Sequence, residues 1–500
     1  MNDRIRRVAV VGIVLLGALI LGTTYWQTWA QGELAAQKDN AIQLVAQFKI
    51  DRGVIRASNG EVVAVNRVLN KNGNTFYLRH YPTGKLVSDI VGYSTQGRSR
   101  AGLERSLNDY LTSSNSDLHT VLDRTLNSLE GKTVKGNSAA LTLRLGPQFV
   151  AQRALGTLCG AVVVLDVKTG KVLVMATSPT YNPNLVEHHF DKINGTKGQC
   201  PSPSPLVNRA TSGTYQPGSS FKLVTAAAAL ESGKYTPYSP FDDPGFCTEF
   251  GKPVYNFGLE SGGPERFGHV NLTQGLQHSI NSVFCNIGKA IGAKAILAQA
   301  KKFGFYSTPP LETPPDERRT SGLYNCDKRG RCKLFYPQHD YQVDPGRLAF
   351  GQERLQVTPL QMAMVAQGIA NGGVVMRPYV VDRILKPGGG TLTTTKPKEI
   401  GQAISPRTAQ QLNTMMQAVV TGGTGTNAQI PGVRVAGKTG TAETGRDSIN
   451  QVWFVAFAPA DNPRYAIAVT VENQVHKTGG EVAAPIAKTV LESLLGQKSP

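Results

Sequence analysis

A serine and a lysine three residues apart, Ser219 and Lys222, stand at the start of a predicted helix. Pro217 and Gly218 end an irregular stretch, and the alanine- and leucine-rich run at 223–231 has strong helix propensity. Positions i and i+3 lie on one face of a helix, so the hydroxyl and the amine would be neighbours at its first turn. Because a lysine with a lowered pKa can take the proton of a serine hydroxyl, this spacing indicates a nucleophile with its own base.

The Ser-x-x-Lys spacing also has an ordinary interpretation. A serine at a helix start is usually an N-cap, and a lysine one turn later is usually a solvated side chain. Two observations favour the catalytic interpretation. The pattern occurs once in the 500 residues, and two further short pieces follow it in order.

The second piece is a Ser-x-Asn pattern formed by Ser279 and Asn281. The same pattern occurs at Ser106, Ser113 and Ser448, so the tripeptide alone carries little information. Only Ser279 lies between the first piece and the third, and its flanking residues are typical of a buried helix. We therefore expect Ser279 and Asn281 to lie beside the serine of the first piece.

The third piece is a Lys-Thr-Gly pattern within a predicted strand, made of Lys438, Thr439, Gly440 and Thr441. Residues 432–437 alternate like a strand edge, and apolar strands follow at 452–457 and 465–471. Lys-Thr-Gly also occurs at Lys168 and Lys477, where the context is that of a hairpin turn and a strand end. We expect Lys438 on one strand of an antiparallel sheet, and ordinary turns at the other two positions.

Residues 432–439 also match the G-x-x-x-x-G-K-[ST] pattern of a phosphate-binding loop. That loop requires flexible inner positions and a helix after it. Here two valines alternate within the pattern, and a glycine-rich segment follows at 440–445. The sequence therefore disfavours a nucleotide site.

The ordered set Ser-x-x-Lys, Ser-x-Asn and Lys-Thr-Gly is typical of penicillin-binding proteins and class A β-lactamases. From about residue 52 to the C-terminus the chain resembles class B penicillin-binding proteins, which are monofunctional peptidoglycan D,D-transpeptidases, of the actinobacterial penicillin-binding protein A type. The segments at 52–64, 102–108 and 358–373 resemble further signatures of that family. Glu353 departs from the pattern because a glycine is expected there, and 141–144 lacks an expected aspartate.

The resemblance implies an α/β (α+β) fold of the penicillin-binding/serine β-lactamase-like type, with an antiparallel sheet that has helices on both faces. It also implies a transmembrane helix and a smaller mixed pedestal domain before that fold. We expect a cytoplasmic N-terminus at 1–7, a transmembrane helix at 8–26, a non-catalytic pedestal at 27–150 and a transpeptidase domain at 156–495.

The resemblance also implies the role of each residue in the three pieces. The serine of the first piece would attack the penultimate carbonyl of a stem peptide that ends in D-Ala-D-Ala, and an amine of a neighbouring strand would resolve the acyl-enzyme. β-Lactams would acylate the same serine. Backbone N–H groups of Ser219 and Thr441 would form the oxyanion hole. The implied catalytic residues are Ser219, Lys222, Ser279, Asn281 and Lys438, and the implied substrate-binding residues are Thr439, Gly440 and Thr441.

Three other activities remain open at this point. A D,D-carboxypeptidase uses the same residues, and only the pedestal favours the transpeptidase. A β-lactamase would need a deacylating glutamate after the second piece, and the Glu-x-x-Leu-Asn string at 104–108 precedes the first piece instead. A β-lactam receptor or a non-catalytic scaffold is disfavoured by the short N-terminus and the complete catalytic set. We expect no cofactor and no metal, because no histidine-rich or Cys-x-x-Cys spacing is present.

Charge and hydropathy predict the location of the chain. Residues 8–26 carry no charge over 19 positions, enough to span a bilayer, and Arg4, Arg6 and Arg7 precede them. A cleaved signal peptide is the alternative, but the stretch is long for one. We therefore expect a single-pass anchor in the cell membrane with an extracytoplasmic catalytic domain. The formal net charge of +18 would then face anionic wall polymers and lipid head groups rather than nucleic acid, and general solubility is an equally good explanation of the charge. The resemblance implies a membrane glycan polymerase as a partner.

Six cysteines in 500 residues do not form an obvious disulfide framework. Cys159 and Cys285 lie in apolar segments, so we expect them to be core thiols. Cys326 and Cys332 lie in a polar loop and could bridge in an oxidising exterior. Cys200 and Cys247 also lie in loop-like sequence, and no pairing follows from it. The proline-rich, basic segment at 307–346 is predicted to be a long exposed insertion.

Overall fold

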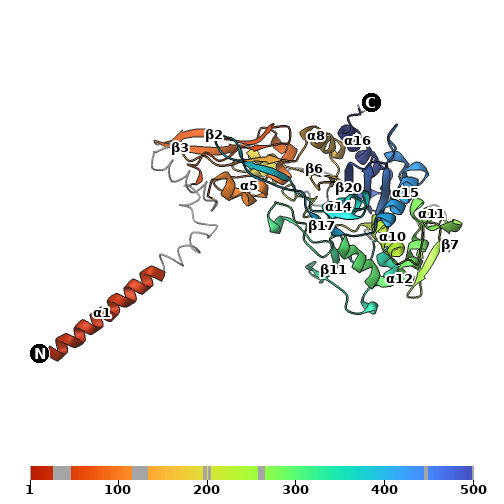
Figure 1. Ribbon diagram of the computed structural model, residues 1–500, viewed down its shortest axis with the longest axis horizontal. Helices are drawn as coiled ribbons and strands as arrows, with labels where there is room; N and C mark the ends of the chain where they lie inside the picture. Colours follow the sequence, from red (N-terminus) through yellow and green to blue (C-terminus); the bar gives the residue numbers. More distant parts are fainter. Residues whose placement is uncertain are drawn as a thin grey trace.

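The computed structural model describes residues 2–25, 47–71, 73–114, 133–194, 200, 204–256, 265–443 and 449–497. Helix α1 (Asn2–Tyr25) stands apart from the rest of the described chain (Figure 1). Its window Arg7–Thr24 has a mean hydropathy of 2.1 and no buried residues, so α1 is long and apolar enough to cross a membrane. Position 26, the last of the predicted span, lies outside the described residues.

A six-stranded sheet forms the unit nearest α1 in sequence, with the order β16-β15-β4-β1-β2-β3. Its long hairpin pairs β2 with β3, while β1 lies parallel to β4. Two of its strands come from the C-terminal half of the chain, within the range that the sequence assigns to the transpeptidase domain. The strands are β1 (Ile55–Arg56), β2 (Val62–Lys71), β3 (Asn74–His80), β4 (Ser138–Leu141), β15 (Val381–Leu385) and β16 (Thr391–Thr394).

The second large sheet has five strands in the order β18-β19-β20-β5-β6, and every neighbouring pair is antiparallel. Strands β5 and β6, and β19 from Val452 onward, are nearly continuous apolar runs, as expected where helices cover both faces of a sheet. The predicted strand around Lys438 is confirmed as β18. The strands are β5 (Gly160–Asp166), β6 (Val172–Ser178), β18 (Ala436–Glu443), β19 (Ile449–Ala458) and β20 (Tyr465–Val475).

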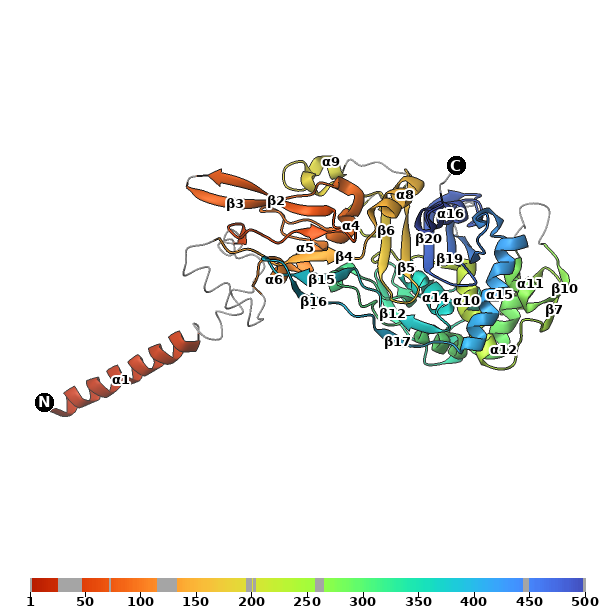
Figure 2. The same cartoon turned by 45° about the horizontal axis from the view of Figure 1, so that its top comes forward.

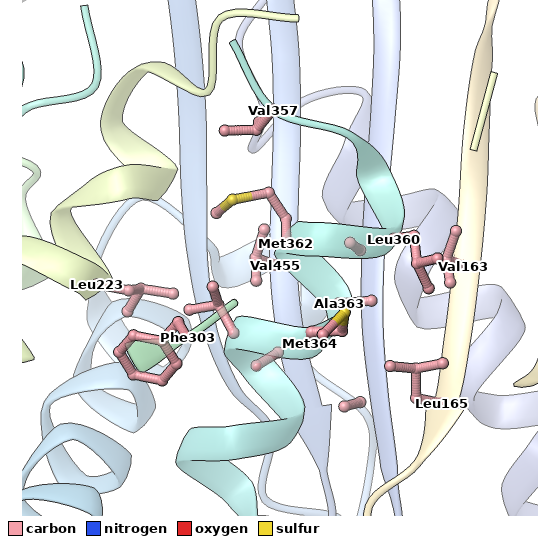
Figure 3. Close-up of a cluster of buried hydrophobic side chains, with 14 of the residues drawn as sticks. Val163, Leu165, Leu223, Phe303, Val357, Leu360, Met362, Ala363, Met364 and Val455 are labelled. Carbon is pink, nitrogen blue, oxygen red and sulfur yellow. The ribbon is translucent and has the colours of Figure 1, made fainter. Parts of the chain in front are cut away.

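Helices pack on both faces of the five-stranded sheet. Alternate residues of β5 point to opposite faces: Val162 and Val164 join a core with α8 (Leu145–Leu155) and α16 (Ala483–Leu495). Val163 and Leu165 instead join the main core on the side of α14 (Pro359–Ala370), and Figure 3 shows their side chains against those of α14. The expected fold, an antiparallel sheet with helices on both faces, is confirmed.

A cluster of helices lies on the far side of the five-stranded sheet from the six-stranded one (Figure 2). It begins with the 3₁₀ turn η4 (Gly218–Phe221), which runs directly into α10 (Lys222–Glu231). The predicted helix start at Ser219 is therefore a tight turn that leads into the helix. The other members are α11 (Leu272–Gln277), α12 (Asn281–Lys302), α13 (Pro345–Ala349) and α15 (Pro406–Gly422).

Shorter elements connect these parts. The remaining helices are α4 (Ser88–Val91), α5 (Gly102–Ser106), α6 (Asn108–Leu111) and α9 (Phe190–Asn194), with 3₁₀ turns η2 (Gly84–Val87), η3 (Pro183–Leu185), η6 (Pro315–Glu317), η7 (Asp340–Gln342) and η8 (Thr426–Ala428). The remaining strands are β7 (Pro240–Asp243), β8 (Phe246–Glu249), β9 (Lys252–Tyr255), β10 (Gly268–Asn271), β11 (Gly322–Cys326), β12 (Cys332–Phe335), β13 (Leu355–Gln356), β14 (Val374–Met376) and β17 (Glu399–Gln402).

The expectation that Cys159 and Cys285 are core thiols is wrong. Cys159 bridges Cys200, and Cys285 bridges Cys247. Both cysteines are fully buried, as expected, but each meets a partner from a segment about 40 residues away in sequence. The bridge between 326 and 332, which the sequence allows, is present and closes the β11–β12 hairpin.

The segment at 307–346 is only partly the exposed insertion that the sequence predicts. The β11–β12 hairpin is largely exposed at its tip. However, β11 also pairs with β13, and Leu311, Leu323 and Val343 are buried in the main core. The segment is therefore anchored to the domain at both ends, because its apolar residues pack into the main core instead of being exposed.

Candidate active site

The turn that carries Ser219 is held between strand β18 and the loop at Gly351. The backbone N–H of Gly218 donates to the carbonyl of Gly351 at 3.1 Å. Gly218 has a φ of +49°, and a Cβ atom there would lie 2.5 Å from the carbonyl oxygen of Thr441. Only glycine therefore permits this approach. Ser219 is half-buried and lines a cavity of about 270 Å³.

Lys222 lies one turn after Ser219 and is fully buried. Its Nζ donates to the carbonyl oxygen of Ser279 at 2.6 Å and to Oδ1 of Asn281 at 2.7 Å, and lies 3.3 Å from Oγ of Ser279. Burial, and next the nearby charge of Lys438, hold the pKa of Lys222 well below its usual 10.5. The amine is therefore the point where the first two pieces meet.

Ser279 and Asn281 lie at the junction of α11 and α12. Ser279 has a φ of +61°, a left-handed conformation that is uncommon for a residue other than glycine. This conformation belongs to the turn that presents the carbonyl of Ser279 to Lys222. The Nδ2 atom of Asn281 donates to the carbonyl of Tyr255 at 3.0 Å, which ties the junction to strand β9.

A buried carboxylate anchors the start of α12 below this junction. Asp243 accepts hydrogen bonds from the hydroxyl of Ser282 and from Nδ2 of Asn256. Asn256 in turn accepts from the backbone N–H of Ser282 at 3.0 Å. Because every member is buried and bonded, the network fixes the backbone that follows Asn281.

Strand β18 brings the third piece against the first two. Lys438 is fully buried, and its Nζ donates to Oγ of Ser279 at 2.8 Å and to the carbonyl of Thr439 at 3.0 Å. Burial lowers the pKa of Lys438 to about 7. Gly440 allows the strand to pass close to the nucleophile turn, because a Cβ atom there would lie 2.8 Å from the carbonyl oxygen of Pro217.

The structure thus gathers the predicted site residues around one cavity. Ser219, Ser279, Asn281, Thr439 and Thr441 all line it. The two lysines reach the same point through their bonds to Ser279, and Gly440 lies where β18 meets the turn.

Several residues that line the cavity were not identified as site residues from the sequence alone. Thr424, which follows α15, shares a hydrogen bond of 2.6 Å with the hydroxyl of Thr439. His278 stacks on Phe267 beside Ser279, with 5.1 Å between the ring centroids. The Gly-Gly-Thr-Gly sequence at 422–425 could have indicated a turn, but its neighbour in space is 15 residues away in sequence.

Glu353 stands where the resemblance led us to expect a glycine. Its φ is +59°, in the region that favours glycine. Its carboxylate pairs with Arg354 at 3.0 Å, and its backbone carbonyl accepts from the side chain of Gln216 at 3.3 Å. The loop therefore keeps the glycine-like backbone that the pattern implies, with a larger residue in it.

Two family models match the chain. The penicillin binding protein transpeptidase domain matches residues 160–492, and the penicillin binding protein A dimerisation domain matches residues 52–139. The chain belongs to the penicillin-binding protein transpeptidase family. The first match covers the five-stranded sheet and all three sequence pieces, and the second covers strands β1, β2 and β3 and the start of β4 in the six-stranded sheet.

Named relatives of this family resemble the whole chain. It is 34% identical to the peptidoglycan D,D-transpeptidase PbpA of Mycolicibacterium smegmatis over the full length of both chains. It is 33% identical to the PbpA of Mycobacterium tuberculosis over 99% of each chain.

Solved structures of the family share its fold. The penicillin G acyl-enzyme complex of penicillin-binding protein A from M. tuberculosis superposes with a TM-score of 0.77 at 32% identity, over 89% of this chain and 100% of that one. A D,D-transpeptidase domain from Eggerthella lenta gives a TM-score of 0.75 at 33% identity, over 90% and 99%.

Proposed function

We propose that this chain is a peptidoglycan D,D-transpeptidase that acts through an acyl-enzyme on Ser219, and that β-lactams inhibit it by acylating the same serine. Family membership and the PbpA relatives support the activity. The single observation that carries the mechanism is the position of the Lys222 amine, which bonds to both residues of the second piece one turn from Ser219.

Lys222 is suited to take the proton of Ser219. Its lowered pKa favours the neutral amine, which has two N–H bonds and one lone pair. The carbonyl of Ser279 and Oδ1 of Asn281 are the two closest acceptors and can use both N–H bonds. The lone pair then remains free to accept a proton while the serine oxygen attacks the donor carbonyl.

Ser279 is suited to pass that proton to the departing D-alanine. Its hydroxyl oxygen accepts from Lys438 at 2.8 Å and lies 3.3 Å from the amine of Lys222. A proton can therefore move from Lys222 through the hydroxyl to the leaving nitrogen as the C–N bond breaks. An acceptor amine would reverse the relay, losing a proton as it attacks the acyl-enzyme.

The remaining polar groups of the cavity would hold the donor. Thr439 and Thr441 line the cavity, and their hydroxyls would bind the terminal carboxylate. Asn281 keeps a second N–H on Nδ2 for the substrate amide, since the first is given to Tyr255. Backbone N–H groups of Ser219 and Thr441 would form the oxyanion hole, and loss of one such donor typically raises a barrier by about 3 kcal/mol.

Labelled penicillin tests this proposal on the full-length chain. We expect a long-lived adduct that maps to Ser219, while rapid hydrolysis would indicate a β-lactamase. Lys222→Met should abolish labelling, and Lys234→Met, at an exposed lysine, is the matched control. Normal labelling of the Lys222 variant would exclude its role as the base. A donor peptide supplied with an acceptor amine should give the cross-linked product; release of D-alanine alone would indicate a carboxypeptidase.

We also infer that α1 anchors the chain, with Arg4, Arg6 and Arg7 on the cytoplasmic side and the catalytic domain outside. Disulfides persist in oxidising compartments, so the three bridges support this orientation. Protease added outside intact cells should digest the catalytic domain; full protection would contradict the orientation. A membrane glycan polymerase partner follows from the family resemblance, and co-purification with such a polymerase tests it.

A further inference from the structure

A second cavity lies where the two large sheets approach each other. Its volume is about 380 Å³, and none of its lining residues lines the catalytic cavity. We call it the basic cavity, because four of the side chains that line it are cationic and one is anionic. These residues are Arg56, Arg144, Lys171 and Arg383, with Asp382.

Strand pairing sets two of these arginines side by side across the six-stranded sheet. Arg56 on β1 and Arg383 on β15 both pair with Ala140 on the strand between them. Residues that pair across neighbouring strands present their side chains on the same face, and two strand spacings separate the backbones by about 10 Å. Ala140, which lies between the two arginines in this register, contributes only a methyl group to the lining of the cavity.

A bulge in β15 keeps the one carboxylate away from these arginines. The register shifts between Val381 and Arg383, so Asp382 is the extra residue. Its carboxylate pairs with the Lys171 amine at 2.9 Å. The negative charge of Asp382 is thereby matched by a lysine of the other sheet unit.

The remaining cations have no carboxylate partner among the described residues. Arg144 stacks near the ring of Tyr465, with 5.8 Å to its centroid, and Arg56 donates to the carbonyl of Gly60 at 3.1 Å. Arg383 is exposed and makes no side-chain hydrogen bond or ion pair within the described part of the chain. The cavity therefore presents unneutralised guanidinium groups around a small apolar floor.

We propose that the basic cavity binds stem-peptide carboxylates of a peptidoglycan strand, as a second contact for the polymer whose cross-linking is the proposed function. Guanidinium groups match carboxylate geometry with two parallel hydrogen bonds. A cavity of this size holds a short peptide end rather than a folded protein. A polymeric substrate extends beyond the catalytic cavity, and a strand long enough to contact both cavities would have a raised effective concentration at Ser219.

The test measures strand binding by the full-length chain in detergent after penicillin has blocked Ser219. The probe is a preparation of soluble, uncross-linked peptidoglycan strands, used with free carboxylates and again with amidated ones. The cavity variant is Arg56→Gln with Arg383→Gln, and the control is Lys234→Gln with Arg407→Gln, which removes the same charge from exposed positions elsewhere. Two partly exposed charge pairs contribute about fivefold each at most, so we expect the cavity variant to bind about 10- to 25-fold more weakly.

The outcomes separate this proposal from its alternatives. Wild type and the control should bind free-carboxylate strands equally and amidated strands weakly, and all variants should react with penicillin at the same rate. If the cavity variant and the control variant lose affinity equally, the binding depends on net charge and not on this cavity. Unchanged affinity in the cavity variant would exclude the site. Preferred binding of polyglycerol phosphate would overturn the choice of ligand. Arg383→Glu, a single change at an exposed residue, replaces a cation with an anion. It should weaken binding more than neutralising the same residue would, and it provides a second variant.

Discussion

Replacement of Gly440 by alanine should slow acylation of Ser219 without touching any reacting atom. A Cβ atom at this position would lie 2.8 Å from the carbonyl oxygen of Pro217, 3.0 Å from the backbone nitrogen of Ser220 and 3.0 Å from Cβ of Trp453. Two of these atoms belong to the backbone of the nucleophile turn, so no side-chain rotation can relieve the contact. The turn and strand β18 must move apart.

The size of that movement gives the expected effect. Ordinary contact begins at 3.4 Å, so the shortest distance in Gly440→Ala is about 0.6 Å too short. A displacement of about 1 Å in a catalytic site can cost about 100-fold in rate, so we expect acylation to slow by about tenfold or more. Tenfold corresponds to about 1.4 kcal/mol of activation free energy. Overpacking should also lower the free energy of unfolding by about 1–3 kcal/mol.

The assay is the second-order rate of labelling by a fluorescent penicillin. Gly401→Ala is the matched control, because a Cβ atom at Gly401 meets nothing within 4 Å. The control should react at the wild-type rate. If Gly440→Ala also reacts within twofold of wild type while it stays folded, the close approach of β18 to the turn does not control the geometry of the serine.

The pH dependence of acylation should follow the protonation of Lys222. Because burial holds its pKa well below 10.5, the labelling rate should rise with pH as the amine becomes neutral and level off before pH 10.5; a rate that falls over that range contradicts the base role. Glu353 has a φ of +59°, which favours glycine. The Glu353→Gly variant should therefore be more stable than the Glu353→Ala variant by about 1 kcal/mol in denaturant unfolding, and equal stability would show that the backbone there is unstrained. Removing the bridge between Cys247 and Cys285, whose sequence separation is 38, should lower the free energy of unfolding by about 3–4 kcal/mol. Removing the bridge between 326 and 332, whose separation is 6, should cost less because the closed loop is shorter. The reverse order would contradict the loop-entropy explanation.

The elements that carry the three sequence pieces could be predicted because each piece has a local signal as well as a place in an order. Apolar alternation identified the strand at Lys438, and helix propensity identified the helix after Ser219. Their convergence is not local: Lys222 meets Asn281 only because α10 and α12 pack together. The order of the three motifs, and the family it resembles, supplied that information.

Contacts between segments that are distant in sequence could not be predicted. The sequence around Cys159 predicts a buried residue, and Cys159 is buried. Nothing in that sequence indicates that its disulfide partner lies 41 positions later. Strand β15 likewise pairs with β4 across about 240 residues, and β16 joins the sheet by pairing with β15. A short strand of ordinary composition fits either sheet, and only packing selects one.

Burial does more for this chemistry than charge does. Removal from water is the first cause of the lowered pKa of both Lys222 and Lys438. Every residue of α10 from Lys222 to Leu230 is buried, and the ring of Phe284 lies 5.3 Å from the Lys222 amine. The alanine-rich helix continues directly from the turn that carries Ser219, and its close packing excludes the water that would keep the Lys222 amine protonated. A polar substitution in that helix should impair acylation by restoring the lysine pKa, even where the backbone does not move.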